Sequence, residues 1–318
     1  MSVLSQQVSA LSQSLSSQAA ALSVRIDTQS QGISVLSQQV SVLSQLHSTL
    51  SQAVSVLSQK VSAVGAWFVR GLSALVSGTS TVNMAADAAG FWASVDNSIH
   101  TIISVAAVTN NIGLSAGVDN GRDQAAVFGA SNWIHFYFVL DGTTVKTRSS
   151  LTGPPTGPAL QGTERAWAYA GAVRYNASAL LLLVRMRDSW TWYELDDGGA
   201  NRVLTAGQAT TFTTVDLSGL IPPNTRHFRV NSLLLLRHNL ADVRFEAHLR
   251  PTGSGLTVGA LITLTRTQVA DVAVEGVNEF VFVPGTSDDV DYVINAAPST
   301  SGGLYLDVTG YQVPNGGE

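Results

Sequence analysis

A seven-residue period appears in Ser34-Val-Leu-Ser-Gln38, Ser41-Val-Leu-Ser-Gln45 and Ser55-Val-Leu-Ser-Gln59, with one repeat skipped between the last two. An earlier copy of the same five residues occupies positions 2–6. Apolar residues on a seven-residue period are typical of a coiled coil, in which parallel helices bury one seam against each other. We therefore predict that residues 1–65 form a coiled-coil stalk.

The predicted seam consists of apolar residues spaced alternately three and four positions apart. Between Leu22 and Ile26 the rhythm takes four extra residues, a stutter that locally unwinds a supercoil. Outside the seam the residues are mostly Ser and Gln, so the helix depends on burial of the seam for its stability. The oligomerisation seam comprises Val8, Leu11, Leu15, Leu22, Ile26, Ile33, Leu36, Val40, Leu43, His47, Leu50, Val54, Leu57, Val61 and Val64.

Competing features of the sequence bear on the number of helices in the coiled coil. Ile or Val at the a positions with Leu at the d positions favours two strands. The polar layers Gln18 and Gln29 and the additional apolar residues Val35, Val42 and Val56 favour three. We predict a homotrimer, with a dimer as the alternative. His47 is interpreted as a polar layer that fixes the register, and an axial ion or pH-sensitive site is the second interpretation.

Composition excludes several functional classes. The net charge is −5, only 12% of the residues are charged, and Lys and Arg form no cluster, so no nucleic-acid partner is expected. Cysteine is absent, which removes disulfides, thiolate metal sites and cysteine nucleophiles. No apolar run approaches the ~20 residues that a membrane-spanning helix needs, so no membrane insertion is expected.

Beyond the stalk the pattern changes to short apolar runs and period-two alternation, interrupted by Gly, Pro and Asn. We predict a connector over residues 66–97, partly helical around Met84–Ala89. A first β module over residues 98–175 and a C-terminal β-sandwich of jelly-roll type over residues 176–318 follow. The predicted fold class is thus a parallel α-helical coiled coil followed by an all-β head in a homotrimeric fibre.

No nucleophile elbow, phosphate-binding loop or zinc-protease motif occurs, so the chain is not expected to be an enzyme or to carry a cofactor. Paired carboxylates of a glycosidase could come only from Glu164, Glu194, Asp196 and Asp197. The acidic loop around Asp288 offers oxygen ligands for Ca²⁺ without the spacing of an EF-hand. A pairing of His238 with His248 is a further weak candidate, and no metal site is predicted.

The best binding candidate is an aromatic strand followed by two acids. Trp190, Trp192 and Tyr193 could contact the ring of a glycan while Asp196 and Asp197 bind its hydroxyl groups. The competing interpretation is structural. Alternation places Trp190 and Trp192 on the same strand face, which is more often a core face.

Three segments together carry a resemblance: Trp133-Ile-His-Phe-Tyr-Phe-Val139, Leu151-Thr-Gly-Pro-Pro155 and Trp167-Ala-Tyr-Ala-Gly-Ala-Val-Arg174. Their order and spacing resemble a module of bacteriophage tail-fibre and receptor-binding proteins, over residues 98–195. The resemblance implies a homotrimeric virion component, on the tail or the capsid surface. Its N-terminal end would contact other virion proteins and its head would recognise a bacterial surface glycan or protein.

Members of that family often begin with a globular domain that anchors them to the particle, whereas here the repeat starts near residue 3. This departure keeps an alternative open, in which the chain is a structural capsid head fibre or decoration protein without a dedicated receptor. The two hypotheses differ in whether the head carries a binding site.

Overall fold

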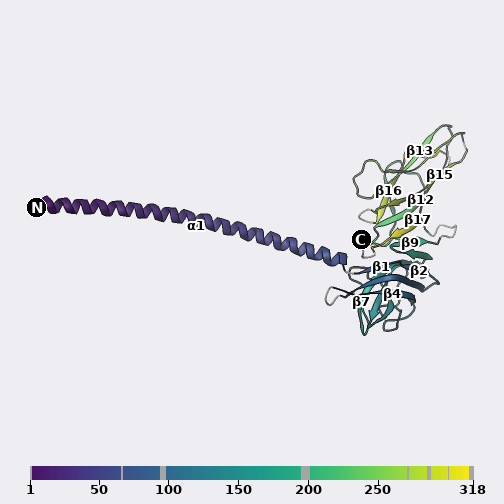
Figure 1. The fold of residues 1–318 in the computed structure, drawn as a ribbon. Coiled ribbons are helices and arrows are strands. Elements are labelled where there is room, and N and C mark those ends of the chain that lie inside the picture. Colours follow the sequence, from purple (N-terminus) through teal and green to yellow (C-terminus); the bar gives the residue numbers. More distant parts are fainter. Residues whose placement is uncertain are drawn as a thin grey trace. The chain divides into compact units, whose positions relative to one another are not determined.

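The computed structural model describes residues 2–65, 67–93, 98–194, 201–270, 272–284, 288–299 and 301–314. The chain divides into two compact units, residues 1–61 and 62–318. Its one helix among the described residues, α1, spans Ser2–Gly65, and every later element is a strand. The predicted N-terminal helix and β-rich head are thereby confirmed (Figure 1).

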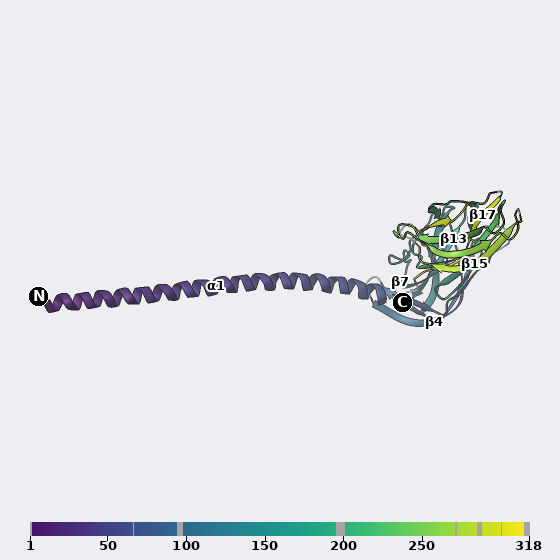
Figure 2. The ribbon, with the colours of Figure 1, turned by 90° about the horizontal axis from the view of Figure 1, so that it is seen from above.

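Helix α1 continues without interruption through the expected stutter (Figure 2). Its apolar side chains are open to solvent in the single chain: Leu22 and Ile26 are each 56% exposed and Leu11 is 72% exposed. A helix with so much apolar surface in water lacks the packing that normally stabilises a long helix. The seam residues Val54, Leu57, Val61 and Val64 lie outside the residues whose side chains are described.

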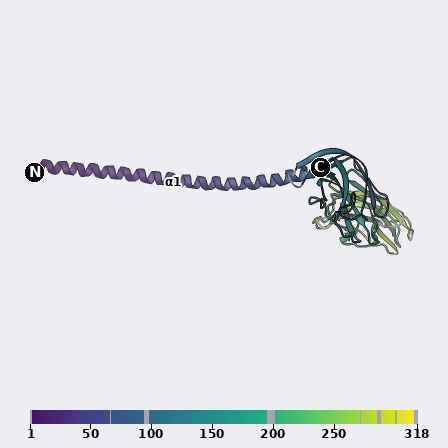
Figure 3. The same cartoon turned by 90° about the horizontal axis from the view of Figure 1, so that it is seen from below.

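In its described residues the head contains seventeen strands, and Figure 3 shows them gathered into one body. They are β1 (Phe68–Arg70), β2 (Ser73–Val76), β3 (Thr81–Ala93), β4 (Ser98–Asn111), β5 (Asn132–Asp141), β6 (Thr144–Ser150), β7 (Glu164–Tyr175), β8 (Val184–Arg187), β9 (Trp190–Tyr193), β10 (Arg202–Gly207), β11 (Thr213–Asp216), β12 (His227–Arg237), β13 (Arg244–Pro251), β14 (Ala260–Arg266), β15 (Val274–Phe282), β16 (Asp289–Ile294) and β17 (Ser301–Gln312).

The expected connector is wrong in its secondary structure. Residues around Met84–Ala89 belong to β3, and no helix occurs in the described part of 66–97. Buried and exposed residues alternate over the first half of β3, with Val82, Met84 and Ala86 inside. That is the period of a strand, so burial against β2, β4 and β7 overrides the helix propensity of alanine.

The large sheet has the order β15-β12-β17-β9-β8-β2-β3-β7-β5-β6, with β1, β4 and β10 attached beside this path. Strands on both sides of residue 175 therefore share one sheet. The joint is made by β9 and β17, which lie between the two halves of the head in Figure 1.

The second sheet has the order β11-β16-β13-β14, and its strands β11 and β14 contact β10, β12 and β15 of the large sheet. Strand β12 alternates strictly, with Phe228, Val230, Leu234 and Leu236 buried. Strand β13 meets it with Phe245, Ala247 and Leu249. The two inner faces form a sandwich core, as expected of alternating strands in packed sheets.

The other half of the head has an aromatic core. Trp167 contacts Trp67 at 5.9 Å and Trp92 at 5.1 Å between ring centroids, and Tyr137 and Tyr169 complete the cluster. Trp67 follows directly on the helical segment in the sequence, yet it is only 5% exposed within the head. Edge-on contacts of this kind add to the free energy of burial.

Candidate ligand-binding site

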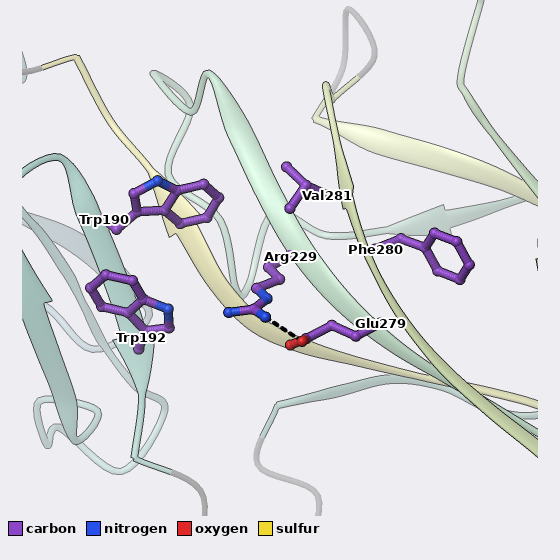
Figure 4. Close-up of a pocket in the computed structure, with 6 residues that line it drawn as sticks. All are labelled: Trp190, Trp192, Arg229, Glu279, Phe280 and Val281. Atoms are coloured by element: carbon purple, nitrogen blue, oxygen red, sulfur yellow. Dashed lines mark hydrogen bonds and ion pairs between the residues drawn. The ribbon is translucent and has the colours of Figure 1, made fainter.

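A shallow slot of about 270 Å³ opens on the outer face of the large sheet. It is lined by Trp190, Trp192, Arg229, Glu279, Phe280 and Val281. Figure 4 shows Arg229 lying between the two indole rings and Glu279. The slot thus combines flat apolar surfaces with charged hydrogen-bonding groups, which is the usual make-up of a small-molecule site.

The two tryptophans come from β9, where residues two apart share a face. Their rings lie 6.0 Å apart between centroids at an interplanar angle of 26°, so they present a nearly continuous aromatic wall. Both are half-buried, while Thr191 and Tyr193 on the opposite face are buried. The expectation that the tryptophan face is core is therefore wrong.

Tyr193, which was expected to join the glycan contact, points into the head. It is 9% exposed, and its hydroxyl donates a hydrogen bond to the carbonyl oxygen of Leu220 at 2.5 Å. Burial raises the pKa of Tyr193 above its usual range. Tyr193 therefore supports β9 from the core side and takes no part in the slot. Asp196 and Asp197 lie outside the described residues.

A glycine of β17 lies between Arg229 and Trp192 in the sheet. Gly310 of β17 is paired with Arg229 on one side and with Trp192 on the other, so these three positions share one face. A Cβ atom added to Gly310 would lie 2.5 Å from the carbonyl oxygen of Thr191 and 3.4 Å from the Trp192 ring. Only glycine leaves room for the slot without displacing the backbone.

A bulge in β17 shapes the polar wall. The pairing shifts between Arg229 and Val230, which leaves Thr309 as the extra residue of β17. Thr309 donates from Oγ1 to Oε1 of Glu279 at 3.3 Å. Bulges commonly redirect a side chain in this way beside functional sites.

The charged pair in the slot is accessible to solvent. Arg229 forms an ion pair with Glu279, and the two side chains are 38% and 37% exposed. The guanidinium has five N–H donors and the carboxylate accepts through two oxygens, so both keep unused hydrogen-bonding capacity. Because the charges balance, the slot favours a neutral polar ligand over an ion.

The polar surface continues along β17. Arg202 of β10 donates from Nε and Nη2 to the two carboxylate oxygens of Asp307, at 2.8 and 3.0 Å. The same guanidinium lies over the ring of Tyr305, 5.2 Å from its centroid. Asp307 and Glu279 are both paired with Asn231 of β12, so this cluster shares the face of the slot.

Of the carboxylates considered for glycoside hydrolysis, the two that the structure describes are engaged in separate ion pairs. Glu164 is buried in an ion pair with Arg148 at 2.6 Å, and Glu194 pairs with Arg185 at 2.8 Å on the surface. Each of these carboxylates therefore already has a cationic partner of its own.

Asp291, the last carboxylate of the acidic segment, is similarly committed to internal contacts. The carboxylate of Asp291 accepts hydrogen bonds from Thr214, Thr252 and Arg250 at 2.9, 2.9 and 3.0 Å. These donors hold the pKa of Asp291 below its usual range, although burial acts in the opposite direction and is the largest single influence.

The histidines have separate partners as well. His238 packs on Phe245, whereas His248 contacts the carbonyl oxygen of Gly259 and the Glu246 carboxylate. Among the described residues no group of three or more His, Asp or Glu could hold a metal ion.

Arg229, Glu279 and Gly310 were missed by the sequence reasoning. They lie 37 to 118 residues from Trp192 and join it only through the sheet order β15-β12-β17-β9. The one local signal was Gly310 itself, which interrupts a strand of alternating apolar residues and so indicated a bulge or a close approach.

Comparison with protein-family models and with curated proteins gave no match. Among solved structures, the chain has a weak likeness to one described as the structure of infectious bursal disease virus Gx strain. The likeness covers 77% of this chain and 68% of that chain, with 11% sequence identity and a TM-score of 0.18. A likeness at this level carries no argument about fold or function.

Proposed function

We propose that this chain is a homotrimeric fibre protein of a virus particle, and that its head binds a saccharide on the host surface in the slot between Trp190, Trp192, Arg229 and Glu279. The observation that carries the proposal is the slot itself, where an aromatic wall faces an accessible, charge-balanced ion pair. The proposal assigns the chain a binding role and no catalytic one.

A saccharide fits this arrangement because its ring has an apolar face and a rim of hydroxyl groups. The apolar face would lie on the indole rings, which supply large contact area at a small cost in conformational entropy. Its hydroxyl groups would bond to Arg229 and Glu279, since each hydroxyl can donate and accept. A volume of about 270 Å³ suits one or two sugar rings.

The homotrimer is supported by the apolar surface of α1. Val35, Val42 and Leu46 are 52–61% exposed and lie beside the seam residue Leu43, which is 67% exposed. Apolar positions on both sides of a seam widen the face that must be covered, which favours three helices over two. Three copies would also increase the avidity of a weak site.

The virion location and the partners belong to the same proposal. The N-terminal end of α1 would contact other virion proteins, and the head would meet a bacterial surface glycan or protein. The virion location and these partners rest on the resemblance of residues 98–195 to tail-fibre proteins. No helix among the described residues is long and apolar enough to cross a membrane.

The binding proposal is tested by probing a glycan microarray with the labelled full chain and titrating the best hit as a free oligosaccharide. Trp192→Ala should weaken binding of the free ligand by about tenfold or more, as expected for truncation of a central aromatic anchor. Leu183→Ala, at a side chain 49% exposed outside the slot, is the matched control. Equal binding by both variants would exclude the slot.

A structural capsid fibre without a receptor is the second candidate. It is favoured by the low charge of the chain, with only 12% charged residues. Immunogold labelling of particles separates the two. Label confined to the tail tip supports host recognition, whereas label spread over the capsid together with a blank microarray supports the structural role.

A further inference from the structure

Exposed apolar side chains of the head are concentrated in one segment. Nine of the eighteen exposed large apolar residues in the described head lie within residues 256–283, a stretch of 28 positions. This segment contains β14, β15 and their flanking loops, and we refer to it as the β14–β15 side. The nine residues are Leu256, Val258, Leu261, Leu264, Val269, Val272, Val277, Val281 and Val283.

The β14–β15 side is one lateral edge of the sandwich. Strand β14 ends the four-stranded sheet, and β15 ends the large sheet. The two edges approach closely at Gly276, where an added Cβ would lie 2.8 Å from Oγ1 of Thr263 and 3.0 Å from the carbonyl oxygen of Leu264. The chain therefore passes from one sheet to the other along this edge.

Apolar residues occur on both flanks of this edge. On the β14 flank, Leu261 and Leu264 are paired with His248 and Glu246, which places them on the outer face of the four-stranded sheet. Burial agrees with that placement, because Leu261 is 44% and Leu264 is 46% exposed.

On the β15 flank, Val277 and Val281 are paired with Leu233 and Arg229, on the outer face of the large sheet. Val277 is 62% exposed and Val281 is 54% exposed. The edge is therefore a wedge with an apolar surface on each side.

We propose that the β14–β15 side is the contact between neighbouring heads in the homotrimer, and that its occupant is a second copy of this chain. The inference rests on the trimer put forward above. In a closed three-fold ring each copy meets its two neighbours through two different surfaces. A wedge with two apolar flanks meets that requirement, because the β14 flank of one head can face the β15 flank of the next.

The size and composition of the surface suit such a contact. The nine side chains expose on the order of 800 Å² together, which the ring divides between two contacts, so they give each contact about 400 Å² per partner, and neighbouring polar groups would supply the rest of the ~800 Å² share of a standard interface. Four of the 28 residues of the segment are charged, namely Arg266, Asp271, Glu275 and Glu279, so charged groups accompany the apolar side chains, as at the rim of an interface.

Solitary heads would also be liable to aggregate through this edge. Among the described residues, strand β15 forms ladder hydrogen bonds only with β12, and β14 packs beside its other edge at Gly276 without pairing with it. Exposed edges with apolar side chains are usually covered in native proteins. Since Val281 also lines the slot, the slot would lie at the rim of the contact.

The test uses the absence of cysteine from the chain. Single variants Val277→Cys and Leu261→Cys are made in the full chain, with Val127→Cys as the control because Val127 is 75% exposed and distant in sequence from the segment. Sedimentation equilibrium gives the assembly state, and the rate of labelling with a maleimide measures the accessibility of each thiol. Circular dichroism confirms that each variant is folded.

The expected result is a trimer in which the thiols at 277 and 261 react about tenfold or more slowly than the thiol at 127, equivalent to about 1.4 kcal/mol of protection. When the two variants are mixed and reassembled, a bis-maleimide should link 277 of one copy to 261 of another. A trimer with equal labelling rates and no cross-link would overturn this interface and leave the trimer standing. A monomer would overturn both the interface and the trimer.

Discussion

The buried histidine His135 should make the head lose stability in mildly acidic solution. His135 is 5% exposed in β5, and burial lowers its pKa from 6.5 to about 4. Its Nδ1 lies 3.0 Å from the hydroxyl of Tyr169, whose oxygen accepts a hydrogen bond from Nδ2 of Asn224 at 3.3 Å. In this chain of hydrogen bonds, Asn224 donates to Tyr169, and Tyr169 donates to the neutral imidazole of His135. A proton on Nδ1 would break the chain of hydrogen bonds.

The direction of the pH effect on stability follows from proton binding by the folded and the unfolded chain. Between pH 6.5 and 4 the unfolded chain binds a proton at His135 that the folded head does not, so stability falls as the pH is lowered through this window and is fully present above it. From pH 7.5 to 4.5 the loss is about 2.5 kcal/mol, obtained by integrating the linkage relation between the two pKa values.

The assay is urea unfolding at pH 7.5 and 4.5, followed by tryptophan fluorescence at one protein concentration. The comparison variant is His135→Asn, which keeps a polar atom near the Nδ1 position and does not titrate in this range. The variant should be less stable at pH 7.5 because of the cavity it creates. Its loss between the two pH values should be smaller than that of the natural chain by about 2.5 kcal/mol. An equal loss in both proteins would refute the reasoning.

Further predictions concern other buried and seam residues. Arg148→Met should destabilise the head by about 3–5 kcal/mol in urea unfolding, because Glu164 is left buried and unpaired, and adding Glu164→Gln should recover part of the loss. Tyr311→Phe should cost about 1–2 kcal/mol in the same assay, since it removes the 2.6 Å hydrogen bond to the carbonyl oxygen of Ala172. Leu43→Asp should shift the full chain toward monomer in sedimentation equilibrium, whereas Ser44→Asp should not. If Leu43→Asp stayed trimeric, the contacts that drive assembly would have to lie outside the helix seam.

Local periodicity was enough to predict the elements with strong patterns. The seven-residue period predicts the helix, and the alternation of apolar residues from His227 to Arg237 is the local pattern that predicts β12. It failed at β3, where the run Ala85-Ala-Asp-Ala-Ala89 has the propensity of a helix and is a strand because neighbouring strands bury it. The apolar residues of segment 125–129 favour a strand, yet the segment is a loop, in which the carbonyl oxygen of Ala125 accepts a hydrogen bond from the buried Arg122.

The slot could be predicted only in part. Alternation in β9 correctly placed Trp190 and Trp192 on one face, but a strand of four residues does not reveal which face is buried. Which face of β9 is buried depends on the strands that pair with it, because these place Tyr193 and Thr191 against the core. Arg229 and Glu279 could not be associated with the tryptophans, because sheet order is a long-range property that no local pattern encodes.

Strand β17 has a consequence for how the head is made. It is paired with β12, β10 and β9, and all three precede it in the sequence. During synthesis β17 therefore emerges from the ribosome after all three of its partner strands. The two halves of the large sheet cannot be joined until then. The helix, by contrast, emerges before the head, so in the proposed trimer it could meet the helices of neighbouring nascent chains early. Assembly from a shared polysome would then begin at the N-terminal end and finish when β17 closes each head.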